Sequence, residues 1–369
     1  MTPGWMRLAD ESAVPSPALL VHPDRIGENL RRMIALAGDP ARLRPHLKTH
    51  KLPQLIALQA SLGITRCKAA TIAEAEMAAG SGATEVTLST QPVGPNADRL
   101  VALMRKFPAV AFSTIADDTG AVDALAIAAQ AGGVTIEVLV DLDVGMARTG
   151  VPPGPAAAEL YRRIARARGL RPGGLHAYDG HLRQPVLADR VAAAAEGIAR
   201  VDALATLLRG EGLSVPRLVW GGTPTFPVHA RRAGVECSPG TCVLWDAGYA
   251  KNLPDLDFLH AAVLLTRVIS RPGPGRLCLD LGHKAVASEM PHPRVIFPEL
   301  PDARAVTHSE EHLVVETAEA ERFPVGSVLY GIPWHVCPTV ALHDRVVVVR
   351  EGRVADAWPV TARARRLGV

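Results

Sequence analysis

Aromatic residues and cysteines are scarce in this chain. Only 4% of its 369 residues are aromatic and no arginine-rich stripe is interleaved with them, so nucleic acid is not an expected partner. The five cysteines are odd in number and scattered, which favours reduced thiols in the cytoplasm over a disulfide framework. No stretch approaches the apolar length of a membrane span, and Asp10 and Glu11 interrupt the N-terminal stretch where a signal peptide would lie. We therefore expect a cytoplasmic protein that binds neither nucleic acid nor a membrane.

Short strand-like runs alternate with helical patterns through the first two thirds of the chain. The strand-like runs are residues 43–47, 64–70, 85–89, 110–114, 134–142, 174–178, 217–221 and 234–237. The helical segments between them include residues 71–79, 97–106, 120–131, 155–167 and 187–209. About eight such repeats are the number found in a (β/α)8 barrel, whereas the competing doubly wound sheet usually begins with a glycine-rich phosphate turn that this chain lacks. Residues 22–257 are thus predicted to form a TIM-type β/α barrel.

The pattern changes after residue 257. Residues 261–269, 276–281, 312–316, 327–330 and 344–349 resemble strands, and convincing helical periodicity is absent between them. We expect an all-β domain composed of residues 258–369 together with residues 1–21. A hydrophobic content of 48% and a formal charge of +3 suit a soluble protein with one large and one smaller domain.

Polar residues follow most of the predicted barrel strands. Because the carboxyl ends of barrel strands meet on one rim, these side chains are expected to converge there. They are His46 and Lys48, then Ser89, Thr90 and Gln91, then Asp141, Asp143 and Arg148, then His176, Tyr178, Asp179 and His181, then Gly221, Gly222 and Thr223, and finally Ser238, Gly240 and Thr241.

Lys48 lies in the stretch Arg-Pro-His-Leu-Lys-Thr-His-Lys at residues 44–51. Neighbouring cations and desolvation both disfavour the charged form of a lysine, and a neutral amine can form a Schiff base. A solvated basic turn is the alternative. The turns at residues 221–223 and 238–241 are built of small residues whose backbone N–H groups can approach a phosphate, although each alone is more often an ordinary turn. Together with Lys48 they suggest pyridoxal phosphate as the cofactor.

Two further side chains can contact such a cofactor. Arg148 can hydrogen-bond its phenolic oxygen, or else form a surface ion pair of little energetic value. Tyr178 can stack on the ring, or else be an ordinary buried tyrosine.

A separate pair of candidate ligands lies near the C-terminus. On an extended strand, His335 and Cys337 would point to the same face and could bind one divalent ion together. Two protein ligands leave open positions, as a catalytic metal requires. The alternative is a strand with incidental polar residues. Cysteine favours zinc, and manganese is the other candidate.

These stretches, in this order, resemble the D-threonine aldolase and D-serine dehydratase family of alanine-racemase-like, fold type III enzymes. The matching segments are residues 44–51, 143–150, 221–225, 238–241 and 335–337. The resemblance implies a pyridoxal-phosphate barrel with a β domain, in a homodimer whose active site lies at the interface. It assigns the Schiff base to Lys48, the phenolic oxygen to Arg148, the ring to Tyr178, the phosphate to the two turns and a divalent ion to His335 and Cys337.

The family resemblance leaves the reaction open. Its aldolases pair the histidine with an aspartate and its dehydratases with a cysteine, as here, whereas residues 177–180 look closer to the aldolase branch. A D-threonine aldolase that cleaves D-β-hydroxy-α-amino acids is the first hypothesis, with His181 or a metal-bound water as the base. The alternatives are a dehydratase of D-serine or 3-hydroxyaspartate, in which Lys48 takes the α-proton, a non-catalytic pyridoxal-phosphate carrier and an amino-acid racemase.

Overall fold

The computed structural model describes residues 2–369, which form two compact units. The first unit contains the chain up to Leu30, Thr49–Leu52 and Thr241–Arg363. The second contains Arg31–Lys48, Pro53–Gly240 and Ala364–Val369. Helix α1 (Pro23–Ala37) begins in the first unit and ends in the second.

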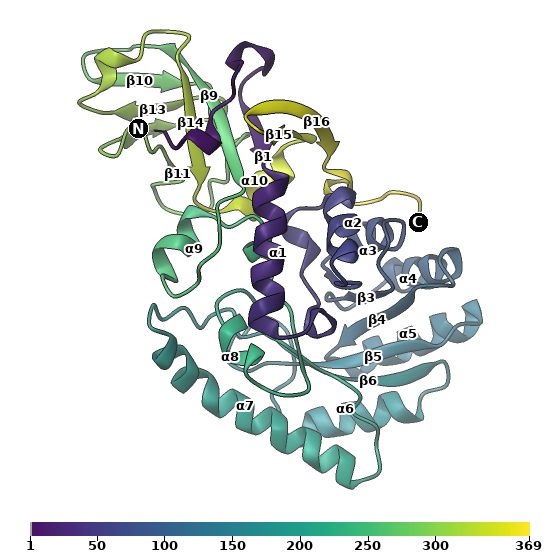
Figure 1. Cartoon of the computed structure of the whole chain (residues 1–369). Coiled ribbons are helices and arrows are strands. Elements are labelled where there is room, and N and C mark those ends of the chain that lie inside the picture. Colours follow the sequence, from purple (N-terminus) through teal and green to yellow (C-terminus); the bar gives the residue numbers. More distant parts are fainter. Residues whose placement is uncertain (1) are drawn as a thin grey trace. The chain divides into compact units, whose positions relative to one another are not determined.

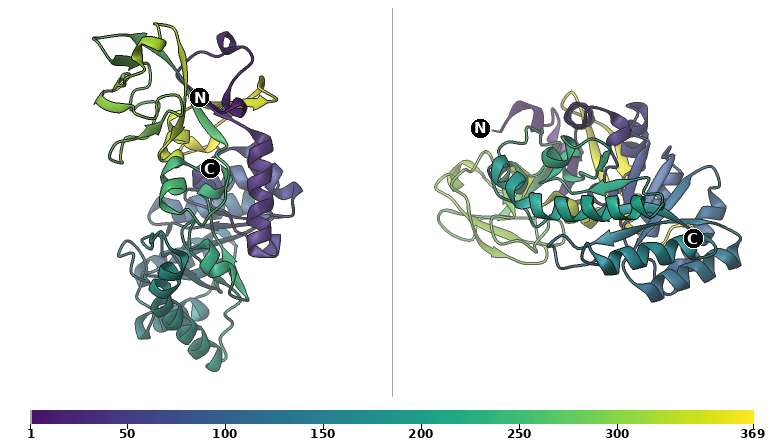
Figure 2. Two further views of the ribbon diagram at one scale, coloured as in Figure 1. Left: turned by 60° about the vertical axis from the view of Figure 1, so that its left-hand side comes forward. Right: turned by 90° about the horizontal axis from the view of Figure 1, so that it is seen from below.

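The second unit is built on a parallel sheet of seven strands that follow one another in chain order. The strands are β2 (Arg66–Ala69), β3 (Glu85–Leu88), β4 (Ala111–Ala116), β5 (Ile136–Leu142), β6 (Leu170–Ala177), β7 (Leu218–Trp220) and β8 (Val235–Cys237). The helices are α2 (Pro53–Ser61), α3 (Ile72–Ala79), α4 (Pro95–Lys106), α5 (Thr119–Gly132), α6 (Pro155–Arg166), α7 (Leu187–Gly210) and α8 (Phe226–Ala230). In Figures 1 and 2, helices α4 to α7 lie outside the strands.

The predicted first barrel strand, residues 43–47, is wrong as a regular strand. Leu43 and His46 instead form single parallel bridges, to Cys237 of β8 and to Lys68 of β2. Pro45 has no N–H to donate to a ladder, and the chain turns into a 3-10 helix at Leu47–Thr49. The segment still occupies the eighth position, between the two edge strands of the sheet. The β/α barrel prediction is therefore confirmed, with seven regular strands and one bridged segment.

Local sequence signals set the helix ends in this unit. The Thr71 side chain accepts the Glu74 N–H at 3.1 Å and caps α3, and Asp118 accepts the Ala121 N–H at 2.9 Å and caps α5. Gly133 ends α5 in the left-handed conformation at φ +66°. Because the strands are parallel and each is followed along the chain by a helix, the residues that connect strand ends to helices lie on one rim.

The first unit contains a mainly antiparallel sheet of nine strands. They are β1 (Ala18–Val21), β9 (Ala262–Ser270), β10 (Arg276–Leu279), β11 (Val295–Ile296), β12 (Arg304–His308), β13 (Leu313–Glu316), β14 (Val328–Pro333), β15 (Arg345–Arg350) and β16 (Arg353–Pro359). The N-terminal strand β1 pairs antiparallel with β9 and parallel with β15. Alternate residues such as Leu20, Val263 and Leu265 point into one buried core.

The first unit also contains helices that the sequence pattern did not reveal. They are α9 (Ala247–Asn252) and α10 (Val336–Leu342). His335 is the N-cap of α10 and Cys337 lies in its first turn, so the expectation that both residues lie on an extended strand is wrong. Pro338 is tolerated in a first helical turn because its missing N–H is not needed there. The Val336 N–H donates to Asp246 Oδ2 at 3.0 Å, a contact distant in sequence that supports the start of the helix.

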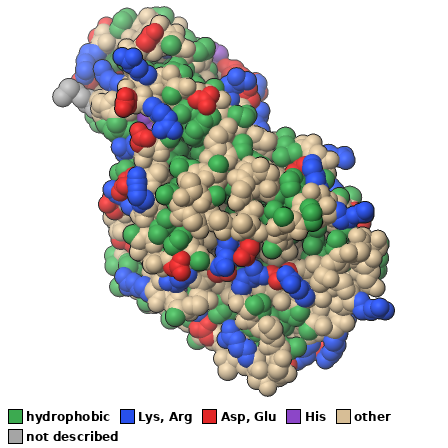
Figure 3. All heavy atoms as spheres, turned by 45° about the vertical axis from the view of Figure 1, so that its right-hand side comes forward, with side chains coloured by type: hydrophobic (Ala, Val, Ile, Leu, Met, Phe, Trp, Pro, Cys, Tyr) green, Lys and Arg blue, Asp and Glu red, His purple; other side chains and the backbone are tan. Residues whose placement is uncertain are grey.

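On the face shown in Figure 3, Lys and Arg side chains are interspersed with Asp and Glu, and no large region of the described surface carries one sign of charge. Within residues 2–369, no helix combines the length and apolarity needed to cross a membrane.

Candidate active site

A cavity of about 370 Å³ opens among the rim residues of the second unit. Its lining is His46, Lys48, Ala70, Ser89, Thr90, Gln91, Val93, Ile115, Asp117, Asp141, Arg148 and Thr149. The structure thus brings together seven of the polar residues that the sequence places after strands, from three different strand ends. Asp117 and Thr149 also line it, although sequence reasoning did not single them out.

Tyr178, directly after β6, lies beside the two principal cations of this cavity. Arg148 Cζ is 4.7 Å and Lys48 Nζ is 5.9 Å from the centroid of its ring. Both distances allow cation–π attraction. Gly222 packs on the ring so closely that an added Cβ would lie 2.9 Å from Tyr178 Cε2. A larger residue at position 222 would therefore displace the aromatic ring.

The side chain of Asp179 stabilises the turn after β7 by hydrogen bonds. One carboxylate oxygen accepts the Thr225 hydroxyl at 2.5 Å, and the other lies 2.7 Å from His229 Nε2. Gly221 adopts φ +70°, which favours glycine. Asp179 is 2% exposed and is not one of the residues that line the cavity, so its role is to stabilise the turn.

The turn after β8 contains an unmatched polar group. Ser238 is 3% exposed, and its hydroxyl has no hydrogen-bond partner among residues 2–369. The neighbouring Gly240 N–H donates to Thr223 Oγ1 at 3.2 Å, which ties the two small-residue turns together. A buried hydroxyl without a partner is costly unless something binds there, so this turn has the properties of an anion cradle. Thr241 belongs to the first unit, where its hydroxyl is 3.5 Å from Cys337 Sγ.

His335 and Cys337 contact each other in the first unit, although neither is on a strand. Their side chains are hydrogen-bonded to one another, and His335 Nδ1 also contacts Glu289. The Cys337 thiol lies 3.3 Å from the hydroxyl of Thr49, the residue that follows Lys48 in the chain.

His335 and Cys337 each stabilise the charged form of the other. Burial alone would lower the pKa of His335, but Cys337, Glu289 and Asp246 raise it to about 9. Burial alone would raise the pKa of the Cys337 thiol, but the hydrogen bond and charge of His335 outweigh burial and lower this pKa. The pair thus favours an imidazolium and a thiolate. Burial raises the pKa of Asp246 to about 6.

The donor set of this pair fits a divalent ion with an open coordination sphere. An imidazole nitrogen and a thiolate sulfur in direct contact are ligands that zinc accepts. Within residues 2–369, no three His, Cys, Asp or Glu side chains are grouped to hold a metal ion. Two protein ligands would leave positions for water and substrate.

His181 does not line the cavity. It is exposed, and its Nε2 lies 3.0 Å from where a Cβ on Gly145 would be. Gly145 belongs to the same loop as Arg148, so the imidazole lies against the segment that carries this cation.

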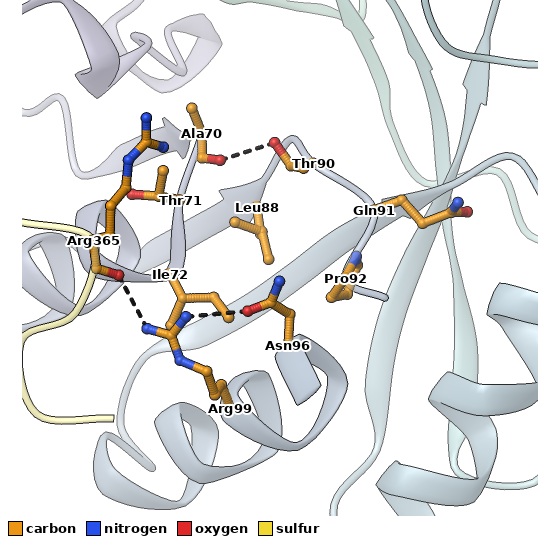
Figure 4. Close-up of a pocket in the computed structure, with 10 residues that line it drawn as sticks. All are labelled: Ala70, Thr71, Ile72, Leu88, Thr90, Gln91, Pro92, Asn96, Arg99 and Arg365. Atoms are coloured by element: carbon orange, nitrogen blue, oxygen red, sulfur yellow. Dashed lines mark hydrogen bonds between the residues drawn. The ribbon is translucent and has the colours of Figure 1, made fainter. Parts of the chain in front are cut away.

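A second pocket, of about 230 Å³, shares Ala70, Thr90 and Gln91 with the cavity (Figure 4). Arg99 lies in its wall and donates to the Arg365 carbonyl at 3.3 Å and to Asn96 Oδ1 at 3.1 Å. The last residues of the second unit are thereby held beside the rim.

Comparison with known proteins decides the family. The alanine racemase N-terminal domain matches residues 21–245, and the serine dehydratase domain matches residues 261–349. A D-threonine aldolase of Arthrobacter sp is 33% identical over 95% of this chain and 93% of its own length. The chain belongs to the D-threonine aldolase and D-serine dehydratase family. This family consists of pyridoxal-phosphate enzymes of fold type III that act on D-β-hydroxy-amino acids.

Other members of the family resemble the chain over nearly its whole length. A 3-hydroxy-D-aspartate aldolase of Paracoccus denitrificans is 31% identical over 96% of this chain and 94% of its own. The crystal structure of D-threonine aldolase from Filomicrobium marinum has a TM-score of 0.88 at 31% identity, and covers 98% of this chain and 99% of its own. A D-threo-3-hydroxyaspartate dehydratase, solved as a cysteine-to-alanine variant in the metal-free form, shares the fold with a TM-score of 0.81 at 24% identity, over 94% of this chain and 97% of its own.

Several polar residues around these sites escaped the sequence analysis. Lys68 lies on β2, and Asp246 and Glu289 are far from the His335 pair in sequence. Lys68 carried one usable signal, because a lysine in the middle of a predicted barrel strand requires a buried partner. No such signal marks Asp246 or Glu289, whose roles depend on tertiary contacts.

Proposed function

We propose that this protein is a pyridoxal-phosphate and divalent-metal-dependent D-threonine aldolase, which cleaves a D-β-hydroxy-α-amino acid to glycine and an aldehyde. The observation that carries the proposal is the placement of Lys48 and Arg148 beside the Tyr178 ring, with both cations lining one cavity. The similarity to two aldolases over nearly the full chain supports it.

The residues present fit the cofactor at both of its ends. Lys48 would hold the aldehyde, Arg148 would donate to the phenolic oxygen and Tyr178 would lie against the ring. The unmatched Ser238 hydroxyl and the N–H groups of the turns at 221–223 and 238–241 would receive the phosphate. When bound, pyridoxal phosphate supplies an electron sink for the bond broken next to the amino group.

The metal would be held by His335 and Cys337. A divalent ion there, zinc or manganese, supplies Lewis acidity toward the β-oxygen of the substrate. Glu289 contacts His335 Nδ1 and would orient the imidazole so that its other nitrogen faces the ion.

The chain offers two bases for the two reactions of this family. In the aldolase reaction His181 would take the proton of the β-hydroxyl at Nε2 while the Cα–Cβ bond breaks. In a dehydratase, the amine of Lys48 would instead take the α-proton while hydroxide leaves. We expect the protein to act as a homodimer.

Dehydration of D-serine or 3-hydroxyaspartate is the second candidate, and Cys337 favours it. In solved structures of a D-threo-3-hydroxyaspartate dehydratase, a histidine and a cysteine two residues apart have each been replaced, and the cysteine variant is in the metal-free form. His335 and Cys337 have the same spacing. This similarity also supports the proposed metal ligands.

Product analysis separates the candidates. The purified protein is incubated with D-threonine, D-serine and D-threo-3-hydroxyaspartate, with pyridoxal phosphate and Zn²⁺ or Mn²⁺ added. The proposal expects glycine and acetaldehyde from D-threonine. Keto acid and ammonia would establish the dehydratase instead. Interconversion of D- and L-amino acids would point to a racemase, and bound cofactor with no turnover would point to a carrier.

Ser238→Ala tests the phosphate cradle. Because the hydroxyl has no hydrogen-bond partner in the described part of the chain, its removal should leave the cofactor-free protein as stable or about 1 kcal/mol more stable. The loss of a hydrogen bond to a charged phosphate should weaken cofactor binding roughly 10-fold. Thermal unfolding and a spectroscopic cofactor titration measure the two effects. Ser113→Ala is the matched control, since its buried hydroxyl is 2.8 Å from Thr87 Oγ1 and should affect stability alone. Unchanged cofactor affinity in Ser238→Ala would argue against the cradle.

A further inference from the structure

Lys68 is a buried lysine in the barrel of the second unit. It lies on β2 and is only 2% exposed. Lysines are almost never fully buried unless they are paired, because an isolated ammonium in a protein interior is very costly. A buried amine beneath a candidate active site therefore requires an explanation.

The amine is the end of a hydrogen-bonded series that reaches the cavity wall. Lys68 Nζ lies 3.3 Å from His176 Nε2, and His176 Nδ1 lies 2.6 Å from Asp141 Oδ1. The other carboxylate oxygen of Asp141 accepts the Thr149 hydroxyl at 2.9 Å. Asp141 and Thr149 both line the cavity.

The direction of these bonds follows from their chemistry. A carboxylate accepts, so His176 Nδ1 carries the proton and Nε2 is left to accept from Lys68. Burial and the nearby cations lower the pKa of His176, which keeps the ring neutral. Lys68 is thus linked to the Asp141 charge through a neutral imidazole. We call these three residues the Lys68 relay.

The charged and titratable groups around Lys68 come from several elements. They are Arg44 from the bridged segment, Lys48 from the 3-10 helix that follows it, Asp141 from β5, Arg148 from the following loop and the neutral His176 from β6. Burial, then Lys48 and Arg148, lower the pKa of Lys68 to about 7, and Asp141 opposes them. Because the pKa of Lys68 lies near neutral pH, a change of charge in the cavity would change the protonation of its amine.

We propose that the Lys68 relay takes up a proton from solvent when an aldehyde phosphate such as pyridoxal phosphate enters the cavity, so that cofactor binding is linked to protonation of Lys68 Nζ. The inference rests on the proposed function. Lys48 and Arg148, which lower the pKa of Lys68, are the cations that would hold the aldehyde and the phenolic oxygen of the cofactor. The negative charge of the cofactor would offset them and favour the ammonium form of Lys68. Lys68 is a positioning residue in this scheme, since it acts through His176 and Asp141.

Calorimetry of cofactor binding measures the linked proton. Pyridoxal phosphate is titrated into cofactor-free protein in two buffers of different ionisation enthalpy, at several pH values between 6 and 8, while visible absorbance counts the bound cofactor. Lys68 is mostly neutral at pH 8, so the free protein has nearly a whole proton to gain there and little to gain at pH 6. We expect wild type to take up about one proton more per chain than Lys68→Met at pH 8, with the difference falling toward pH 6.

Two further variants make the result specific. Lys68→Arg keeps a cation beside His176 that does not titrate in this range, so it should lose the linked proton even if Lys68→Met folds poorly. Lys284→Met removes an exposed lysine paired with Glu310 and should behave as wild type.

The outcomes separate this inference from the proposed function. Cofactor binding by a Lys68 variant with an unchanged proton count would overturn the relay alone. Wild-type binding with no rise in proton uptake from pH 6 to pH 8 would do the same. A protein that binds no pyridoxal phosphate would overturn both.

Discussion

Lys48→Ala is expected to abolish the visible absorbance that cofactor addition gives the wild-type protein, and to reduce turnover by at least roughly 10²–10⁴-fold. Lys48 Nζ lies at the cavity wall, 5.9 Å from the centroid of the Tyr178 ring, and in our proposal no other amine holds the cofactor aldehyde. An absorbance spectrum with a matched activity assay measures both effects.

Two matched variants separate covalent attachment from charge. Lys48→Arg keeps a cation in place but cannot join an aldehyde in the same way, so it should fail as completely as alanine. Lys51→Ala removes the lysine three residues further on, which lies 3.5 Å from the Ala362 carbonyl and not in the cavity lining, and should retain the spectrum. A wild-type spectrum in Lys48→Ala would remove this lysine from the mechanism.

The rim of the second unit was predictable because its physical cause is simple. Residues that follow parallel strands meet at one edge, so locating β2 to β8 by their apolar runs also placed Ser89, Gln91, Asp141 and Arg148. The helices were equally accessible, because caps such as Asp118 are local signals.

The remaining features depend on contacts that a single sequence does not display. The start of α10 depends on Asp246, 90 positions before Val336, so His335 and Cys337 looked like part of a strand. His335 and Cys337 are nevertheless in contact, because the first turn of a helix also brings their side chains together. Pro45 similarly turned an expected strand into a bridged segment without changing its place in the barrel.

His335→Ala and Cys337→Ala are each expected to reduce turnover by about 10³-fold while leaving the cofactor spectrum intact, because a lost Lewis acid is worth several kcal/mol of transition-state stabilisation. Metal analysis of the purified variants should show a loss of bound zinc or manganese. Treatment of wild type with a chelator should reproduce the defect, and added metal should reverse it. Cys278→Ala, at another buried cysteine of the first unit, is the control that should retain activity and metal.

The double variant provides the sharper test of a shared ion. Two ligands of one metal act as a unit, so losing both should cost little more than losing either, whereas independent structural roles would give additive losses. His335 and Cys337 are hydrogen-bonded to each other, so a double-mutant cycle based on protein stability would also report the loss of this bond. The double-mutant cycle is therefore measured on kcat and on metal content together. Full turnover in the presence of chelator, or additive losses with metal content unchanged, would refute the metal role and leave the pair as the capping turn of α10.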